Sequence, residues 1–286
     1  MPKIPNFKIL KTLGKGTFGV TYLVTNKKNQ KFALKTIDIE ESTKNGVNSN
    51  RIQLEIDTLI NLSSYPHCYP YIACYYTSSK GTFEGKNVVF ILSEYVKGPS
   101  FQQLIDERSK LDNYLLPNIL WLYMYQLISG LNYIHKLNYA HRDIKPENII
   151  LNEVTNMPKI IDFGLSCMHD CKDRSGSLFW LPPEVFDTNY VPDLDLAKAH
   201  DVWSLGVVFY ELANFALPFH ISDFNDVDSV LKGILSPPIE SDYNFPSSES
   251  PIIKYINYVI DSMLNPDPYQ RPEVDTVINF MEDKMR

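Results

Sequence analysis

The most informative stretch of this 286-residue chain is His141-Arg142-Asp143-Ile144-Lys145-Pro146-Glu147-Asn148. It places a carboxylate, an amine and an amide within eight residues, directly after an apolar helical run. Fourteen residues after Asn148 comes Asp162-Phe163-Gly164. Two oxygen ligands for Mg²⁺ and one carboxylate that can accept or orient a hydroxyl proton are what phosphoryl transfer from ATP requires. The spacing therefore favours this chemistry over the commoner role of a loop Asp as a turn-stabilising cap.

A glycine-rich turn lies near the N-terminus, between two expected strands. Gly14-Lys15-Gly16-Thr17-Phe18-Gly19 follows a strand over residues 7–13 and precedes one over residues 21–24. Glycines allow positive φ angles and let a backbone approach phosphate groups closely. A dinucleotide-binding fold would need a helix directly after this turn, and a strand follows instead. Taken alone, the turn is equally consistent with a plain glycine hairpin.

The order of expected elements predicts an α+β fold with two segregated parts, because strands fill the first third and helices the remainder. Further strands are expected over 32–37 and 88–92, and a helix over 51–62 separates them. Helices follow over 101–107, 118–135, 202–215, 252–264 and 274–285. We expect one bilobal domain over residues 1–286, and the family resemblance described next implies an N-lobe over 1–93, a hinge over 94–98 and a C-lobe over 99–286.

In this order, the motifs resemble the catalytic domain of serine/threonine protein kinases over residues 7–281. By that resemblance Asp143 is the catalytic base and Lys145 neutralises the transferring γ-phosphate, while Asn148 and Asp162 bind Mg²⁺. Lys35, in Ala33-Leu34-Lys35, would bridge the α- and β-phosphates of ATP with Glu55 as its partner. A lone strand lysine is otherwise usually just solvated.

The resemblance also implies an adenine and phosphate site. The residues expected to form it are Leu13, Gly14, Lys15, Gly16, Thr17, Phe18, Gly19, Val20, Thr21, Ala33, Lys35, Ser93, Glu94 and Val96. The family usually has Val where Thr21 stands, so the adenine pocket would be slightly more polar. Ser93 would guard the rear of that pocket, and its small size predicts space for bulky ATP analogues.

Residues 162–184 would form the activation segment. Ser177 is expected to hydrogen-bond Asp143 and Lys145, which together with Lys145 indicates Ser or Thr acceptors. Pro182-Pro183-Glu184 replaces the more common Ala-Pro-Glu, and Trp180 stands where Tyr is common. Two structural contacts are also implied by the resemblance. Glu184 should pair with Arg271, and Asp201 should hold the backbone of the catalytic loop.

The residue before the catalytic Asp, Arg142, bears on regulation. In this family an Arg before the catalytic Asp often pairs with a phosphate in the activation segment, and Asp173 stands where that phosphoresidue often lies. A carboxylate could partly replace the phosphate, although with less charge and fewer acceptors. We therefore expect Arg142 to pair with Asp173 and the protein to have substantial activity without activating phosphorylation. The alternative is a solvated Asp173, with Ser175 or Ser177 as the real phosphosite.

Composition sets limits on the class of protein. The chain is 44% hydrophobic, which is ample for a large core. Its formal net charge of −7 argues against nucleic acid as the main partner. Residues 1–95 carry 12 Lys/Arg and 7 Asp/Glu, whereas residues 96–286 carry 15 and 27. This asymmetry would suit a phosphate-binding lobe followed by a lobe for basic peptides, or it is only a lopsided solvated surface.

The N-terminus shows no signal-peptide pattern, and the most apolar helix, expected over 202–217, falls short of a membrane span. We therefore expect an intracellular, cytoplasmic protein with no membrane partner. Its cysteines, Cys68, Cys74, Cys167 and Cys171, should then be reduced thiols.

The activity most consistent with these motifs is ATP-dependent phosphorylation of Ser/Thr hydroxyls in protein substrates, with ATP and Mg²⁺ as cofactors. The first alternative is a pseudokinase that acts as a scaffold. The ligand set argues against it, because a pseudokinase usually lacks one of these groups and none is missing here. The second is a small-molecule kinase, which residues 180–184 disfavour because they resemble the peptide-docking end of protein kinases.

Overall fold

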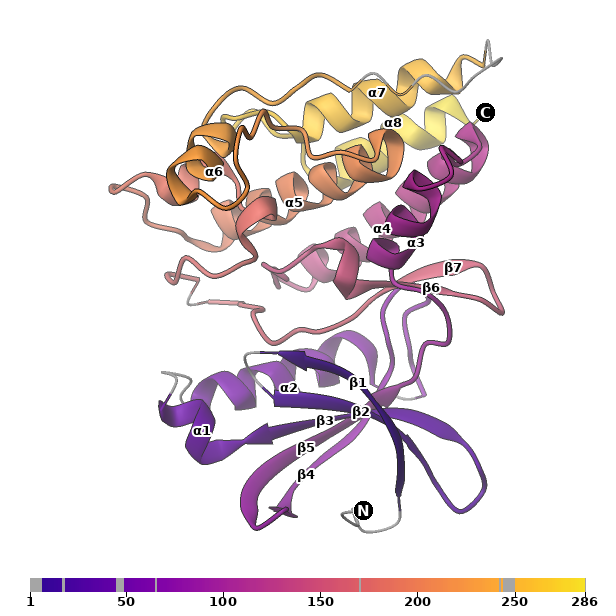
Figure 1. Cartoon of the computed structure of the whole chain (residues 1–286), viewed down its shortest axis with the longest axis vertical. Coiled ribbons are helices and arrows are strands. Elements are labelled where there is room, and N and C mark those ends of the chain that lie inside the picture. Colours follow the sequence, from indigo (N-terminus) through magenta and orange to yellow (C-terminus); the bar gives the residue numbers. More distant parts are fainter. Residues whose placement is uncertain are drawn as a thin grey trace. The chain divides into compact units, whose positions relative to one another are not determined.

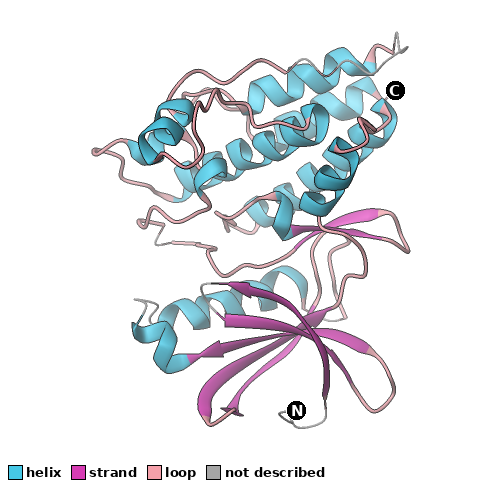
Figure 2. Ribbon diagram, viewed as in Figure 1, coloured by secondary structure: helices cyan, strands magenta, loops and turns pink. Residues whose placement is uncertain are grey.

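A computed structural model describes residues 7–16, 19–44, 49–64, 66–169, 171–241, 243 and 250–285. The chain divides into two compact units, Met1–Lys97 and Gly98–Arg286. Strands dominate the first unit and helices the second (Figure 2). This segregation confirms the predicted α+β class.

The first unit is built on one antiparallel sheet (Figure 1). Its strands run in the order β1-β2-β3-β5-β4. The elements of this unit are β1 (Lys8–Gly16), β2 (Gly19–Thr25), β3 (Lys31–Asp38), α1 (Ile39–Lys44), α2 (Ser49–Ser63), β4 (Tyr75–Phe83) and β5 (Lys86–Glu94).

The two faces of this sheet differ because successive strand residues point to opposite sides. One face is a packed apolar cluster that includes Val24, Leu34 and Phe90. The opposite face carries Ala33 and Lys35, the alternate residues of β3. The Lys35 face is mixed, because the apolar residues Ile37 and Ile91 lie on it as well and are buried.

Two elements of this unit were not predicted. Helix α1 is short, and β4 reads Tyr-Tyr-Thr-Ser-Ser-Lys-Gly-Thr-Phe, with no apolar alternation in its middle. Strand β4 lies at the sheet edge and pairs with the apolar β5, whose core residues are buried. Pairing with a buried neighbour, rather than its own pattern, makes this segment a strand.

The second unit is mainly helical. Its elements are α3 (Phe101–Ser109), α4 (Pro117–Lys136), β6 (Ile149–Asn152), β7 (Met157–Ile160), α5 (Leu194–Asn214), α6 (Val227–Ile234), α7 (Ile252–Met263) and α8 (Val274–Lys284). Three 3₁₀ turns cover Pro146–Asn148, Leu178–Trp180 and Pro183–Phe186. Helix α5 is the central element, because every residue from His200 to Ala213 is buried. A Cβ on Gly206 would come within 3.0 Å of Met263, so a small residue is needed where α5 meets α7.

Helix α5 begins eight residues earlier than predicted. Its N-cap is Asp193, whose carboxylate accepts the Leu196 N–H at 2.8 Å. The capping bond starts the helix although its first turns mix charged and apolar residues. The sequence-based expectation also omitted β6, β7 and α6. Within the described residues, no helix combines the length and the apolar character that crossing a membrane would require.

The expectation of reduced cysteines is wrong. Cys68 is bonded to Cys74 in the first unit, and Cys167 to Cys171 in the second, with Cα–Cα distances of 5.2 and 5.4 Å. Both distances lie in the range that a disulfide needs. Turn geometry decides this pairing, and spacings of six and four residues do not reveal turn geometry.

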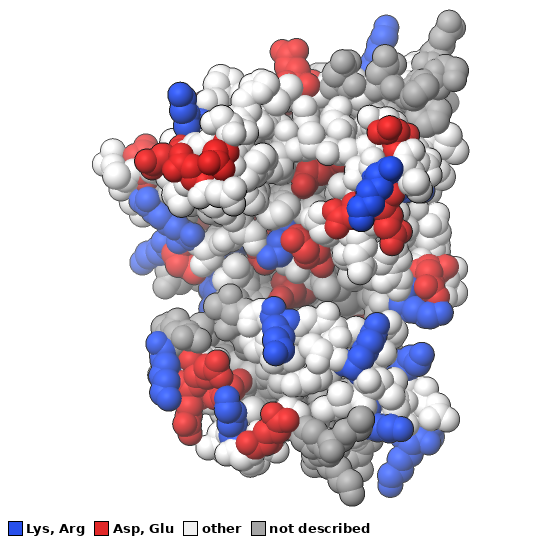
Figure 3. Space-filling model, viewed as in Figure 1, with Lys and Arg blue, Asp and Glu red and all other residues white. Residues whose placement is uncertain are grey.

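Charged side chains of both signs cover the face shown in Figure 3. Lys and Arg are spread over the first unit with Asp and Glu gathered between some of them, and larger groups of Asp and Glu lie on the second.

Candidate active site

One buried carboxylate holds the backbone of the loop His141–Asn148. Asp201, in α5, accepts the backbone N–H of His141 at 2.7 Å and that of Arg142 at 2.6 Å. His135 Nε2 lies 3.0 Å from the same carboxylate. Burial raises the pKa of Asp201, but the hydrogen bond and charge of His135 outweigh this and hold the pKa below its ordinary value. The predicted anchoring role of Asp201 is confirmed.

Asp143 is the hub of this loop. Its carboxylate accepts the Ser177 hydroxyl at 2.7 Å and the Asn148 side-chain N–H at 2.9 Å, and Lys145 Nζ lies 3.2 Å away. Lys145 in turn donates to Ser177 Oγ at 2.6 Å. The predicted bridge from Ser177 to both residues is therefore present. The arrangement fixes a carboxylate next to an amine, where an incoming hydroxyl and a phosphate could be oriented.

The two expected metal ligands are brought together by the backbone. The Asn148 carbonyl accepts the Ile161 N–H at 2.9 Å, so Asn148 lies beside the residue that precedes Asp162. Asp162 has a φ of +60°, which is uncommon for a non-glycine residue. Because Asn148 donates its amide N–H groups to Asp143, its side-chain oxygen is the atom left for a cation. A carboxylate and an amide oxygen are the hard donors that Mg²⁺ prefers, so the donor set fits this metal.

In the first unit, Lys35 Nζ lies 2.7 Å from Glu55 Oε1, so the expected pair forms. Both side chains are mostly buried, at 14% and 5% exposure. Cross-strand register places Thr21 opposite Lys35, and Ser93 opposite Ala33. These residues therefore share one face of the sheet, which α2 contacts through Glu55.

Other expected nucleotide-binding residues lie elsewhere in this unit. Gly14 pairs with Thr21, Lys15 with Val20, and Gly16 with Gly19, so the glycine turn is a strand hairpin. Thr17 and Phe18 lie outside the described residues. Val20 stands opposite Thr36, on the face away from Lys35, so the structure does not group its side chain with the others. Leu13 lies at a register shift in β1 and is partly exposed.

The segment expected to form the hinge follows β5. The Glu94 N–H donates to the Cys74 carbonyl at 2.7 Å, and the Glu94 carboxylate accepts the Cys74 N–H at 3.1 Å. Val96 is buried.

The predicted pairing of Arg142 with Asp173 is confirmed. Arg142 is 1% exposed and its Nη1 donates to the Asp173 carboxylate and, at 3.1 Å, to the Asp173 carbonyl. Its Nε donates to the Leu165 carbonyl at 2.9 Å. The Asp173 side chain is itself 50% exposed. A buried cation on the catalytic loop is thus neutralised by the activation segment.

Arg174 makes a second tie that sequence reasoning missed. Its guanidinium donates to the carbonyls of Val185, Thr188 and Tyr190 at 3.0–3.2 Å and lies over the Tyr190 ring. The acceptors are backbone atoms, which carry no sequence signal. Arg174 thereby connects the backbone just before Ser177 to the backbone of residues 185–190 after it.

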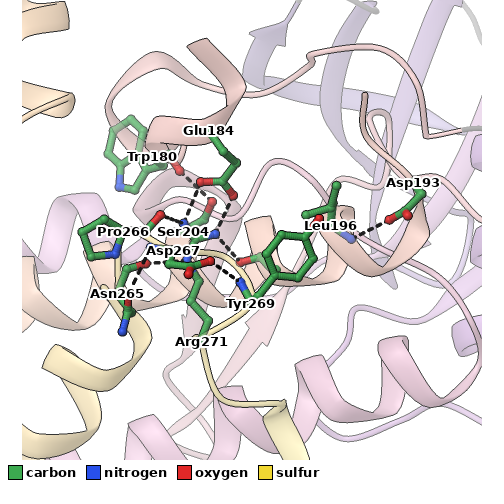
Figure 4. Close-up of polar contacts among 11 residues, drawn as sticks. Trp180, Glu184, Asp193, Leu196, Ser204, Asn265, Pro266, Asp267, Tyr269 and Arg271 are labelled. Carbon is green, nitrogen blue, oxygen red and sulfur yellow. Dashed lines mark hydrogen bonds and ion pairs between the residues drawn. The ribbon is translucent and has the colours of Figure 1, made fainter. Parts of the chain in front are cut away.

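The end of this segment is fixed by a buried ion pair (Figure 4). Arg271 Nη1 and Nη2 lie 2.6 and 2.7 Å from the two carboxylate oxygens of Glu184. Arg271 also donates to the carbonyls of Asn265, Pro266 and Ala199, and it stacks over Trp203. The predicted pair is therefore present, and the guanidinium uses all five of its donors.

Trp180 is held from α5 by two contacts. Its indole N–H donates to Glu211 at 2.9 Å, and its carbonyl accepts the Ser204 hydroxyl at 2.7 Å. Burial raises the pKa of Glu211 to about 8, and the charges of Glu147 and Asp106 add to this effect. No sequence pattern marked this role of Glu211.

The first unit thus holds a strand lysine paired with a helix glutamate, and the second holds an Asp-Lys-Asn loop anchored by Asp201. These features define the class of protein. The family model of the protein kinase domain matches residues 7–281. The chain belongs to the protein kinase domain family.

Its similarity to named kinases extends over most of the chain. CBL-interacting serine/threonine-protein kinase 2 of Arabidopsis thaliana is 30% identical over 91% of this chain and 52% of its own length. Serine/threonine-protein kinase ppk25 of Schizosaccharomyces pombe is 33% identical over 97% of this chain and 60% of its own. Aurora kinase of Saccharomyces cerevisiae is 32% identical over 76% of this chain and 57% of its own. The chain thus spans about half the length of such relatives.

Proposed function

We propose that this protein is an ATP-dependent serine/threonine protein kinase. The observation that carries the proposal is the hub at Asp143, where Ser177, Lys145 and Asn148 converge within 3.2 Å of one carboxylate. Such a hub suits transfer of a phosphoryl group to a hydroxyl, a reaction that depends on positioning and charge rather than on covalent catalysis.

Within this proposal, Asp143 orients the substrate hydroxyl and accepts its proton. Lys145 holds the oxygen charge of the transferring phosphate, and Ser177 keeps both side chains in place. Asn148 and Asp162 would hold Mg²⁺, which when bound neutralises charge on the phosphate oxygens.

The residues proposed to bind the nucleotide belong to the first unit. Lys35, oriented by Glu55, would neutralise the α- and β-phosphates of ATP. The glycine turn would cover the phosphates with backbone N–H groups, and Thr21, Ala33 and Ser93 would contact the adenine. We propose that this set and the Asp143 hub serve the same reaction.

The pseudokinase alternative has no observation in its favour. Lys35 already pairs with Glu55, and Asp143 is bonded to the residues that a kinase needs. An inactive scaffold has no requirement for this hydrogen-bonded arrangement.

The experiment is phosphorylation of a generic basic protein with Mg-ATP by wild type and by Asp143→Asn. The conservative change keeps the shape of the side chain but removes its charge. We expect a loss of at least about a hundredfold in kcat, consistent with removal of a proton acceptor. Asp106→Asn, an exposed carboxylate in α3, is the matched control. Equal activity of wild type and Asp143→Asn would favour the scaffold.

The substrates are proposed to be proteins with Ser or Thr acceptors, and no nucleic acid or membrane partner is expected. Separate regulatory proteins are consistent with the names of the CBL-interacting relatives. An intracellular, cytoplasmic location is part of the proposal. Imaging of the tagged chain tests it.

We further propose that activity does not require activating phosphorylation, because Asp173 already neutralises the buried Arg142. Phosphatase-treated enzyme should retain its kcat, as measured with the same basic protein. An enzyme that is inert until it is rephosphorylated would contradict this.

A further inference from the structure

Two serine hydroxyls of the activation segment act as hydrogen-bond donors to carboxylates. Ser177 donates to Asp143, which belongs to the site already described. Ser175, which is partly exposed, donates to the second carboxylate oxygen of Asp173. The first oxygen of the same carboxylate accepts from Arg142. Ser175 thus lies on the side of Asp173 away from the buried guanidinium.

From this geometry we infer that Ser175 is an inhibitory phosphorylation site, an inference that rests on the proposed kinase function. Modification transfers the γ-phosphoryl group of ATP to Ser175 Oγ. The Oγ–P bond forms, the bond from phosphorus to the bridging oxygen breaks, ADP leaves and the hydroxyl proton is released. The product has lost its donor and carries a charge between −1.5 and −2 at neutral pH.

The charge reversal acts directly on the Arg142–Asp173 contact. A donor facing a carboxylate becomes a dianion facing a carboxylate, and like charges in contact repel. The Asp173 main chain is held by the same guanidinium, because its carbonyl accepts from Arg142 at 3.1 Å, so the segment cannot shift at this residue without losing that bond. The repulsion therefore weakens the contact that neutralises a cation with 1% exposure.

The chain on the other side of Ser175 is equally constrained. Gly176 has a φ of +147°, and a Cβ there would meet Leu181 Cδ2 at 2.5 Å. Because the Asp173 carboxylate contacts both Arg142 and Ser175, a phosphate on Ser175 meets this carboxylate before it can reach the guanidinium, although Arg142 Nη2 is buried without a hydrogen-bond partner among the described residues. Relief of the repulsion must come from movement of the segment itself.

The cation nearest in sequence adds to the effect. Arg174 is bonded to the carbonyls of Val185, Thr188 and Tyr190. A phosphate on the next residue attracts this guanidinium and competes with those carbonyls. The contacts made by Arg142 and by Arg174 with the segment are both weakened. Ser177, which bridges Asp143 and Lys145, lies only two residues after Ser175. The expected result is a lower rate of phosphoryl transfer.

The test uses the full chain with phosphoserine incorporated at position 175, and compares kcat/KM for a basic protein substrate with that of the unmodified chain. We expect a decrease of at least about tenfold, whereas Ser175→Ala should stay within about twofold because it leaves the Arg142–Asp173 pair intact. Phosphoserine at Ser236, whose hydroxyl donates to the Lys232 carbonyl rather than to a carboxylate, is the matched control.

Asp173→Asn tests whether the inhibition depends on the negative charge of Asp173. Without the carboxylate, phosphoserine at position 175 meets no like charge and can reach Arg142, so it should no longer inhibit and should restore activity. Phosphoserine that leaves wild type equally or more active would overturn the inference.

Amide hydrogen exchange over residues 171–190 gives a readout that does not depend on activity. Exchange should be faster in the phosphoserine chain than in the unmodified chain, and equal exchange would overturn the inference. If the unmodified chain has no activity, the proposed function fails, and the exchange result still decides the role of Ser175.

Discussion

Removing the charge of Glu184 should destabilise the second unit strongly. Glu184 and Arg271 are 11% and 1% exposed, and two bonds of 2.6 and 2.7 Å join them. Breaking such a buried pair from one side leaves an uncompensated charge, which costs about 3–5 kcal/mol. For Glu184→Gln this corresponds to a decrease of roughly 6–20 °C in the midpoint of thermal unfolding.

Arg271→Lys tests whether geometry matters beyond charge. Lysine has three donors where the guanidinium uses five, and it cannot form the two parallel bonds to Glu184. We expect a loss of about 3–6 kcal/mol, because hydrogen bonds to charged groups contribute about 1.5–3 kcal/mol each and at least two of the five are lost. The double variant should cost less than the sum of the single variants, since each removes the same contact.

Thermal unfolding followed by circular dichroism measures these effects. The matched control is Asp283→Asn, which removes an exposed pair with Lys284 and should leave the midpoint unchanged. The reasoning would be refuted if Glu184→Gln and Arg271→Lys shifted the midpoint no more than this control.

Three further predictions concern single side chains. Bulky-substituted ATP analogues should bind wild type better than Ser93→Met, and equal affinities in competition binding would contradict an open pocket. Ser177→Ala should lower kcat by about tenfold or more because it removes the bridge between two catalytic side chains, whereas Ser177→Thr should restore it. Burial raises the pKa of Glu211 from 4.5 to about 8, so its folded form holds a proton that the unfolded chain releases. Its contribution to stability is therefore complete below pH 4.5 and is lost as pH rises towards 8, by up to about 1.4 kcal/mol per pH unit. Glu211→Gln should flatten this slope in urea unfolding measured between pH 5 and 8, and an unchanged slope would refute it.

Much of the fold could be read from the sequence, because periodic apolar patterns mark elements that bury one face. Helix α4 and strand β5 lie close to their predicted ranges for this reason. Strand β4 and the first turns of α5 were missed. The pairing partner decides the first and a capping side chain the second, and neither leaves an apolar pattern.

The candidate site divides in the same way. Lys145 and Asn148 could be named from sequence because they lie within five positions of Asp143, whereas Ser177, which is 34 positions away, was named through the family resemblance. Glu184 and Arg271 could be paired only through the family resemblance, since 87 residues separate them. The ties made by Arg174 were out of reach, because backbone carbonyls are present at every position and only the folded chain selects three of them.

The sequence by itself therefore determined the class of fold, the order of the motifs and the residue types of the site, because these depend on local spacing and periodicity. Only the tertiary structure decided that the cysteines are paired, that Glu211 holds Trp180, and that Ser175 donates to the Asp173 carboxylate. Burial, the direction of a hydrogen bond and the sign of a neighbouring charge arise from contacts between distant segments. Those contacts change Ser175 from a candidate activating site into a proposed inhibitory one.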